Sequence, residues 1–301
     1  MAMKIFITGT TGYIGGSLAE RLIRIGHVVS GLVRTEAQAV LVKRRGITPI
    51  IGHLDDGEVL TRAARQADAT INAASSDHRG AVETLVNAMK GSEKPLIHTS
   101  GTSIICDDAR GEYESATRFH DDSFITSLPM RMARVEIDRL VRRAGIDLGI
   151  RTVVICPSMI YGPGRGLQGD SDQIPKLRAQ SQRKGAGLYI GKGLNRWSNV
   201  YIDDLVDLYL LAIERAPSGS FFFAENGEEA LWRVAEAISR SLGFSGETLS
   251  WNADEAIAEY GDWARFALAS NSRVHSTNAC RLLGWTPNGP TLIETVEGDT
   301  K

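Results

Sequence analysis

Residues 5–16 read Ile5-Phe-Ile-Thr-Gly-Thr-Thr-Gly-Tyr-Ile-Gly-Gly, and this stretch decides the fold. A short apolar strand predicted over Lys4–Thr8 runs into three spaced glycines, and an amphipathic helix follows. Gly9 would permit a tight turn, Gly12 a close approach of the backbone to phosphate groups, and Gly15 close packing of helix on strand. Because free N–H groups at a helix start can hold a pyrophosphate, the stretch predicts a dinucleotide site.

The composition indicates a globular chain without a strongly charged partner. Of the 301 residues 43% are hydrophobic, which is ample for a substantial core. The net charge of −2 argues against a nucleic-acid or anionic membrane partner. No apolar run approaches the length of a membrane span, and the N-terminus is already a core strand rather than a signal peptide. We therefore expect a cytoplasmic protein that acts on a small molecule.

The cysteines and histidines indicate a protein of a reducing compartment and predict no metal site. Cys106, Cys156 and Cys280 are far apart and odd in number, as in proteins of a reducing compartment that lack structural disulfides. The six histidines show no ligand-like spacing with cysteines or carboxylates, so no metal site is expected.

Strand-like and helix-like segments alternate from residue 3 to about residue 160. Such alternation predicts an α/β fold with a Rossmann-type, doubly wound parallel sheet. We interpret 1–160 as an NAD(P)-binding domain and 161–301 as a smaller C-terminal substrate lobe, with the elements of 200–215 free to pack back on the first domain. After the first strand and helix, strands are predicted at 27–33, 48–52, 69–73, 95–100 and 149–156, helices at 36–45, 57–66, 79–90, 129–144 and 231–242, and a strand running into a helix at 200–213.

The end of the second predicted strand distinguishes the two nicotinamide dinucleotides. An acidic residue there accepts hydrogen bonds from the ribose 2′-hydroxyl, whereas an arginine pairs with a 2′-phosphate. The chain has Arg34 at this point and no carboxylate before Glu36. Since an arginine–phosphate contact is charge-assisted and geometrically selective, we expect NADP(H). The alternative is that Arg34 is a solvated loop residue.

Six short segments follow one another in an order that resembles a known family. Together they resemble the extended short-chain dehydrogenase/reductases, also called the NAD-dependent epimerase/dehydratase family, although Cys156 replaces the arginine usual before the fifth segment. The segments are Thr8-Gly-Thr-Thr-Gly-Tyr-Ile-Gly15, Gly52-His-Leu-Asp-Asp56, Asn72-Ala-Ala-Ser75, His98-Thr-Ser-Gly-Thr102, Pro157-Ser-Met-Ile-Tyr-Gly-Pro-Gly164 and Asn199-Val-Tyr-Ile-Asp-Asp-Leu205.

The resemblance implies which residues contact the cofactor. They come from the first glycine turn and from the ends of the following strands. The predicted set is Gly9, Thr11, Gly12, Tyr13, Ile14, Gly15, Arg34, His53, Leu54, Ala73, Ala74, Ser75, Thr99, Arg134, Pro157 and Met159.

The resemblance also shows what is missing. Family chemistry depends on a Tyr-x-x-x-Lys pair on one helix face, but this chain has Met130 at the tyrosine position and Arg134 at the lysine position. A thioether cannot transfer a proton. The usual active-site serine position falls on Gly101. Two interpretations of Arg134 stay open: a contact to ribose hydroxyls, or an exposed helix arginine paired with Asp138.

A substitute proton donor must lie within hydrogen-bond reach of the substrate oxygen. We expect Tyr161, Ser100, Thr102 and Arg134 to form the catalytic set, with Tyr161 the leading donor and a purely structural tyrosine as its alternative. Further candidate donors are Ser103, Tyr113 and His120. His98 reads as a packed core histidine, and Asp203 and Asp204 as helix caps. The segments 165–172 and 193–199, with Trp197, line the substrate pocket or form ordinary surface loops.

Three functions are consistent with these features. The first is an NADP(H)-dependent oxidoreductase that passes a hydride to or from a small carbonyl or alcohol. The second is a non-enzymatic NADP(H)-binding regulator or sensor, which the missing tyrosine favours. The third is a nucleotide-sugar epimerase or dehydratase, which Arg34 argues against. A homodimer is the oligomeric state towards which the resemblance leans.

Overall fold

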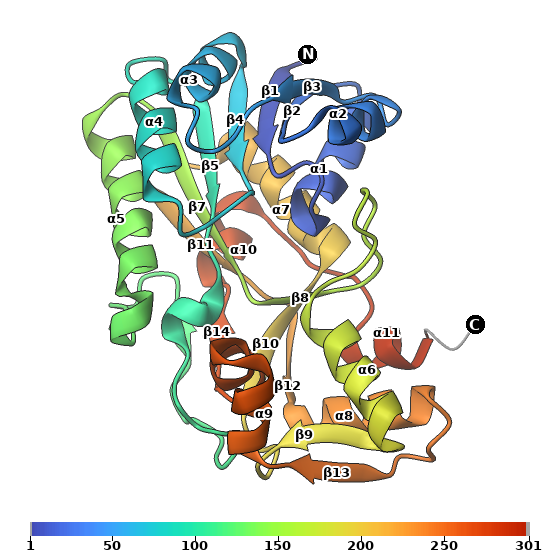
Figure 1. The fold of residues 1–301 in the computed structure, drawn as a ribbon. Helices are drawn as coiled ribbons and strands as arrows, with labels where there is room; N and C mark the ends of the chain where they lie inside the picture. The colour runs from blue at the N-terminus through green and yellow to red at the C-terminus, as the bar shows by residue number, and fades with distance from the viewer. Residues whose placement is uncertain (1, 299–301) are drawn as a thin grey trace.

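The computed structural model describes residues 2–298 (Figure 1). Its strands are β1 (Lys4–Thr8), β2 (Val28–Val33), β3 (Thr48–Ile51), β4 (Ala69–Asn72), β5 (Pro95–Thr99), β6 (Phe119–His120), β7 (Arg151–Pro157), β8 (Met159–Tyr161), β9 (Gly187–Ile190), β10 (Arg196–Tyr201), β11 (Ser220–Ala224), β12 (Gly227–Ala230), β13 (Thr248–Trp251) and β14 (Val274–His275). Its α-helices are α1 (Tyr13–Arg24), α2 (Glu36–Lys43), α3 (Gly57–Gln66), α4 (Arg79–Met89), α5 (Met132–Asp147), α6 (Gln173–Lys184), α7 (Ile202–Arg215), α8 (Leu231–Ser241), α9 (Ala253–Tyr260), α10 (Thr277–Leu283) and α11 (Leu292–Gly298). Short helical turns are η1 (Thr102–Ile105), η2 (Pro129–Arg131) and η3 (Ala264–Leu268).

The large sheet is parallel throughout and has the order β11-β7-β5-β4-β1-β2-β3. From β1 the chain first winds outward through β2 and β3, then returns and winds the other way through β4, β5, β7 and β11. The direction changes between β1 and β4, and a crevice opens beyond the carboxyl ends of such neighbouring strands. The predicted Rossmann-type α/β class is confirmed, and the crevice is where the site is to be sought.

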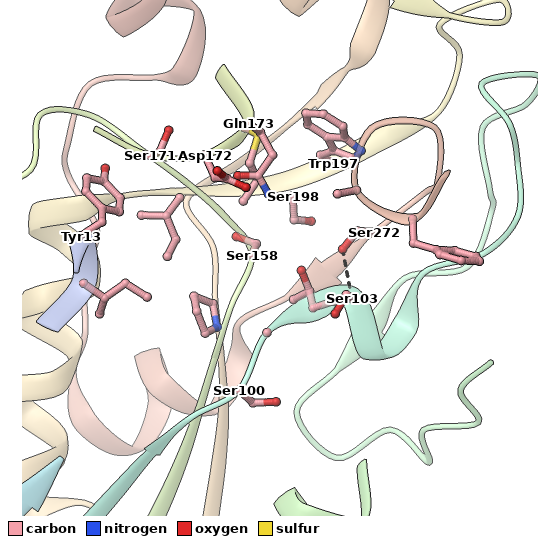
Figure 2. Close-up of a pocket in the computed structure, with 18 of the residues that line it drawn as sticks. Tyr13, Ser100, Ser103, Ser158, Ser171, Asp172, Gln173, Trp197, Ser198 and Ser272 are labelled. Atoms are coloured by element: carbon pink, nitrogen blue, oxygen red, sulfur yellow. Dashed lines mark hydrogen bonds between the residues drawn. The ribbon is translucent and has the colours of Figure 1, made fainter. Parts of the chain in front are cut away.

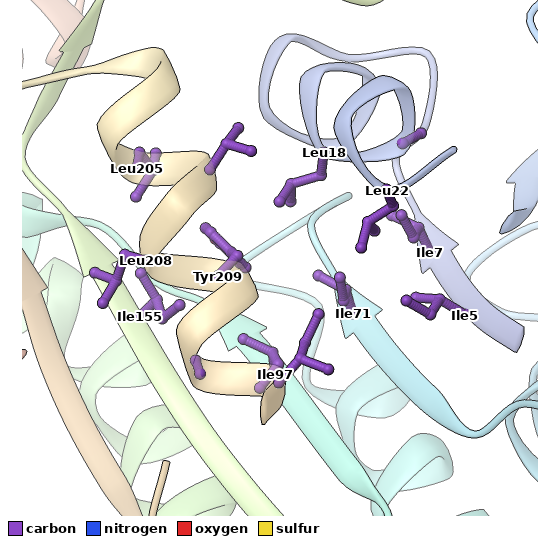
Figure 3. Packing of buried hydrophobic residues seen from close by; sticks show 14 of the residues in the cluster. Ile5, Ile7, Leu18, Leu22, Ile71, Ile97, Ile155, Leu205, Leu208 and Tyr209 are labelled. Atoms are coloured by element: carbon purple, nitrogen blue, oxygen red, sulfur yellow. The ribbon is translucent and has the colours of Figure 1, made fainter. Parts of the chain in front are cut away.

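Two hydrophobic clusters cover the two faces of this sheet. On one face, alternate residues of a strand, such as Ile5 and Ile7, pack with Leu18 of α1 and Tyr209 of α7 (Figure 3). The intervening Phe6 belongs to the other cluster, with the apolar stripes of α3, α4 and α5. Successive residues of a strand point to opposite faces of the sheet, and here both faces are buried. This explains why the strands predicted from the sequence are apolar along their whole length.

The C-terminal part adds a smaller sheet and a third cluster. After β7 the chain leaves the large sheet, and β8 pairs with β10, which pairs with β12. Helices α6, α8 and α11 lie nearby in the lower half of Figure 1. Two segments beyond residue 160 belong to the large sheet and its covering helices. Helix α7 covers one face of this sheet, and β11 pairs with β7 as the seventh strand of the sheet.

Two local predictions differ from the structure. The helix expected over 129–144 begins as the turn η2 and continues as α5 to Asp147. Asp203 and Asp204 do not cap α7, because Asp203 pairs with Arg165, and Asp204 accepts from the backbone N–H groups of residues 288 and 289.

Within residues 2–298, no helix combines the length and apolarity needed to cross a membrane.

Candidate active site

Two neighbouring cavities lie at the crevice, one of about 290 Å³ and one of about 380 Å³. Gly12 and Ala73 line both cavities, so the two meet at the glycine turn. A long, two-ended ligand could therefore lie across the turn with one end in each cavity.

The turn itself is shaped for a close approach of backbone. Gly9 has φ +84°, and a Cβ there would lie 2.7 Å from the carbonyl oxygen of Ala73. Gly12 precedes α1 in extended conformation, and no side chain caps the helix. The first N–H groups of an α-helix have no partner inside the helix. Here they are available to an anion, and the arrangement fits the pyrophosphate of a dinucleotide.

The smaller cavity has the character of an adenosine site. Apolar Leu32 and Leu54 line it together with His53. Arg34, exposed at the end of β2, is its single formally charged side chain among the described lining residues, and no carboxylate lines it. The Arg34 backbone N–H donates to Gln38 Oε1 at 2.9 Å, which fixes the loop from which the guanidinium extends.

The larger cavity is lined by hydroxyl groups and by three aromatic side chains. Ser158, Ser198 and Ser272 reach it from three separate segments, and Ser100 lies at its lower end in Figure 2. Among the site residues expected from the sequence, those that line it are Gly12, Tyr13, Ile14, Ala73, Ser100, Thr102, Ser103, Arg134, Pro157 and Met159. Lining residues not singled out as candidates beforehand include Gln173, Phe266, Ala267, Ser270 and Ser272.

Arg134 enters this cavity with its charge already balanced. Its Nε donates to Asp77 Oδ1 at 2.7 Å, and its Nη1 donates to Ser103 Oγ at 2.7 Å. The hydrogen bond from Arg134 holds the pKa of Asp77 below its ordinary value. The alternative pair expected with Asp138 is wrong: no salt bridge joins the two side chains in the part of the chain that the structure describes.

Asp138, one helical turn further along α5, faces the end of β5. Its Oδ2 accepts from Ser100 Oγ at 2.7 Å, and its Oδ1 lies 3.7 Å from His98 Nε2. All three residues are buried. Burial raises the pKa of Asp138 to about 7, against the opposing hydrogen bond from Ser100 and the charge of Arg134. Burial, helped by Arg134, lowers the pKa of His98 to about 4, so this core histidine is neutral at physiological pH.

Comparison with known proteins agrees with this geometry. A family model described as "NAD dependent epimerase/dehydratase family" matches residues 5–222. The chain belongs to this family. It is 34% identical over 338 residues to "Oxidase ucsJ" of Acremonium sp, covering 99% of this chain and 96% of the relative. The predicted family resemblance is thus confirmed.

The chain is also similar to a further relative and, in its fold, to a solved structure. A "4-hydroxy-2-methyl-3-oxo-4-farnesyl-3,4-dihydroquinoline-1-oxide ketoreductase" of Stigmatella aurantiaca is 26% identical over 299 residues, covering 94% of this chain and 87% of the relative. The crystal structure of a UDP-glucose 4-epimerase from Thermotoga maritima, with UDP-glucose, superposes with a TM-score of 0.79 at 17% identity, covering 99% of this chain and 97% of that one. The protein therefore has an NAD(P)-binding Rossmann fold of the oxidoreductase type.

Tyr161 does not lie where a proton donor is needed. It is 2% exposed, lines neither cavity, and donates its hydroxyl proton towards Pro290 O at 2.7 Å, with Asn226 Oδ1 at 3.2 Å. The reason is that β8 belongs to the smaller sheet, where it pairs with β10, and places the Tyr161 ring in the third hydrophobic cluster. The structural interpretation of Tyr161 replaces the catalytic one.

Tyr161→Phe is expected to lower the free energy of unfolding by about 1–2 kcal/mol, because it leaves the carbonyl of Pro290 without its donor. Urea denaturation of the variant and the native protein measures this difference. Native stability combined with loss of carbonyl turnover would restore a catalytic role.

Three other predicted cofactor residues lie outside both cavities. Thr99 points the other way, since its hydroxyl shares a 2.6 Å hydrogen bond with the Tyr209 hydroxyl on α7. Ser75 accepts from the N–H of Asp77. Gly15 packs against the glycine turn, where a Cβ would lie 2.3 Å from Gly9 O.

Of the further candidate donors, Ser103 lines the larger cavity and accepts from Arg134, whereas the other two lie away from it. Met130 lies on η2, is 51% exposed and does not line it, and neither Tyr113 nor His120 does. The segments 165–172 and 193–199 do contribute, through residues such as Gln168 and Trp197. Asp138 could have been found from its spacing of four residues to Arg134, which places the two on one face of α5.

Proposed function

We propose that this protein is an NADP(H)-dependent oxidoreductase that reduces a small, uncharged carbonyl compound or oxidises the corresponding alcohol. The observation that carries the proposal is the pair of cavities meeting at the glycine turn. One offers Arg34 to a 2′-phosphate, and the other offers hydroxyl and aromatic groups to a substrate. A nicotinamide bound at the junction supplies a hydride donor or acceptor.

The charges of the larger cavity support an uncharged substrate. A nucleoside diphosphate would require cations for its two phosphates. Arg134 is the single arginine or lysine among the described lining residues, and Asp77 neutralises it. The lining residue Asp172, paired with Lys176 at 2.7 Å, adds a carboxylate. We therefore propose carbonyl reduction, rather than a nucleotide-sugar reaction, as the activity of this site.

The relatives support the same reaction class. The Stigmatella relative is named a ketoreductase, and it covers most of this chain. The larger cavity, with Trp197 and Phe266 in its lining, suits a compact apolar body carrying one or two oxygen atoms.

Turnover with a panel of ketones, diketones and aldehydes, followed by the absorbance of NADPH, tests the proposal. We expect NADPH-dependent reduction of at least one uncharged carbonyl compound and none of UDP-sugars. Tight NADPH binding with no turnover across the panel would favour the second candidate, a cofactor-binding regulator, for which the methionine in place of the family tyrosine is the supporting observation.

Arg34→Ala is expected to remove most of a preference for NADPH over NADH. The loss of one bidentate charged contact corresponds to about 1.5–3 kcal/mol, or roughly 10- to 150-fold in affinity. Isothermal calorimetry with both cofactors measures it. Arg44→Ala, which removes an exposed arginine outside both cavities, is the matched control and is expected to keep the preference. Equal affinities for both cofactors in the native protein would contradict the assignment.

A further inference from the structure

A row of polar side chains crosses the buried sheet beside the larger cavity. Thr8, Asn72 and His98 are register partners on β1, β4 and β5, and each is no more than 2% exposed. They lie on the face covered by α3, α4 and α5, as Phe6 and Leu96 two residues before Thr8 and His98 show. Buried polar groups are costly unless they are hydrogen-bonded, so a row in the core calls for a physical reason.

The hydrogen bonds of the row have one direction. Thr8 Oγ1 accepts from the N–H groups of Ala73 and Ala74, so its own proton goes to Asn72 Oδ1 at 2.6 Å. The Asn72 amide nitrogen then donates to His98 Nδ1 at 3.1 Å. A neutral histidine that accepts at Nδ1 carries its proton on Nε2.

The row ends at Asp138. His98 Nε2 points at Asp138 Oδ1 across 3.7 Å, and neither atom has a hydrogen-bond partner among the described residues. The other carboxyl oxygen of Asp138 is bonded to Ser100, which lines the larger cavity. A carboxyl group sealed from solvent thus reaches the cavity through one hydroxyl.

We propose that Ser100 is the proton donor to the substrate oxygen and that Asp138 is the proton reservoir behind it, held by His98. The proposal rests on the proposed carbonyl reduction. It assigns to a serine and a buried carboxyl the task that the family tyrosine would perform.

The step balances as follows. As the carbonyl carbon gains a hydride from NADPH, which is oxidised to NADP⁺, the C=O π electrons move to the oxygen, which takes the proton of Ser100 Oγ. In the protonated form of Asp138, the 2.7 Å hydrogen bond runs from Oδ2–H to Ser100 Oγ. Ser100 takes this carboxyl proton in the same movement and ends neutral. The new carboxylate gains the N–H of His98, which stabilises its charge without giving up a proton. After the alcohol leaves, Asp138 regains a proton from water through Ser100.

Burial outweighs the side chains that face Asp138, several of which lower its pKa. Ser100 and His98 approach it from β5 and its end, Arg134 and Arg142 from its own helix, Asp77 from the loop after β4, and Cys156 from β7. Burial is the largest effect on its pKa and raises it to about 7, where general acids work best at neutral pH. Reduction needs the protonated form, so kcat should be highest below this pKa and fall as pH rises through it.

The decisive experiment compares Asp138→Asn with Asp147→Asn, an exposed aspartate on the same helix. For a ketone that the native protein reduces, Asp138→Asn should lower kcat by about 10²-fold or more and flatten its pH profile. Ser100→Ala should do the same, whereas Ser100→Thr should retain much of the rate. NADPH affinity should change in none of them, and Asp147→Asn should match the native protein.

A second readout does not need turnover. Infrared difference spectra of the native protein minus Asp138→Asn should contain a neutral carboxyl band below neutral pH that disappears above it. Absence of this band, or a native pH profile in Asp138→Asn, would overturn the relay while leaving carbonyl reduction in place. Absence of reduction with every carbonyl compound would instead overturn the proposed function, and the relay with it.

Discussion

Gly12→Val should abolish NADPH binding while the protein remains folded. The valine side chain would extend over the uncapped start of α1, where the phosphates must approach the backbone. Hydrogen bonds to charged groups contribute about 1.5–3 kcal/mol each, so the loss of two would weaken binding by about 100-fold or more. The fold should survive, because a Cβ at Gly12 meets no atom closer than Gly9 O at 3.3 Å.

Fluorescence titration with NADPH, together with circular dichroism, measures binding and folding in the same samples. Gly57→Val is the matched control, since Gly57 also stands at a helix start, lines neither cavity and has room for a side chain. Native affinity in a folded Gly12→Val protein would show that the pyrophosphate lies elsewhere.

Gly15→Val should damage the fold itself. A Cβ at Gly15 would lie 2.3 Å from the carbonyl oxygen and 2.7 Å from the carbonyl carbon of Gly9, and backbone cannot yield as a flexible side chain can. Overpacking of this kind costs about 1–3 kcal/mol and occasionally more, and we expect the upper end of the range.

Urea denaturation of Gly15→Val beside Gly12→Val separates the two glycines, which are three residues apart in one turn. A lower midpoint for Gly15→Val with an unchanged m value would establish a loss of stability alone. Equal midpoints for the two variants would mean that the turn relaxes and that Gly15 has no special packing role.

The strands and helices of the N-terminal half could be predicted because the sequence signals that indicate them are local. The predicted helix over 57–66 coincides with α3, and the strand before the glycine turn coincides with β1. Apolar runs of strand length, helical periodicity and glycines at turns each depend on only a few neighbouring residues. The family resemblance implied the cavity residues at strand ends, and they lie together because parallel strands place their carboxyl ends along one edge.

The position of Tyr161 could not be predicted because it depends on contacts between distant segments. Tyr161 follows a strand of the large sheet in sequence, yet β8 turns away and its hydroxyl meets residue 290. Asp138 was interpreted through its spacing to Arg134, while the residue that neutralises Arg134 lies in the loop after β4. Phe266, from η3, carries no local pattern that marks it as a cavity residue.

The seventh strand has a consequence for how the chain folds during synthesis. β11 pairs with β7 along five register positions, from Ser220 with Val153 to Ala224 with Pro157, but it is made more than sixty residues later. Until then β7 presents an unpaired strand edge, which is prone to pairing with other chains. On the ribosome, the dinucleotide-binding half must therefore wait for Phe221, Phe222 and Phe223 before its sheet is closed.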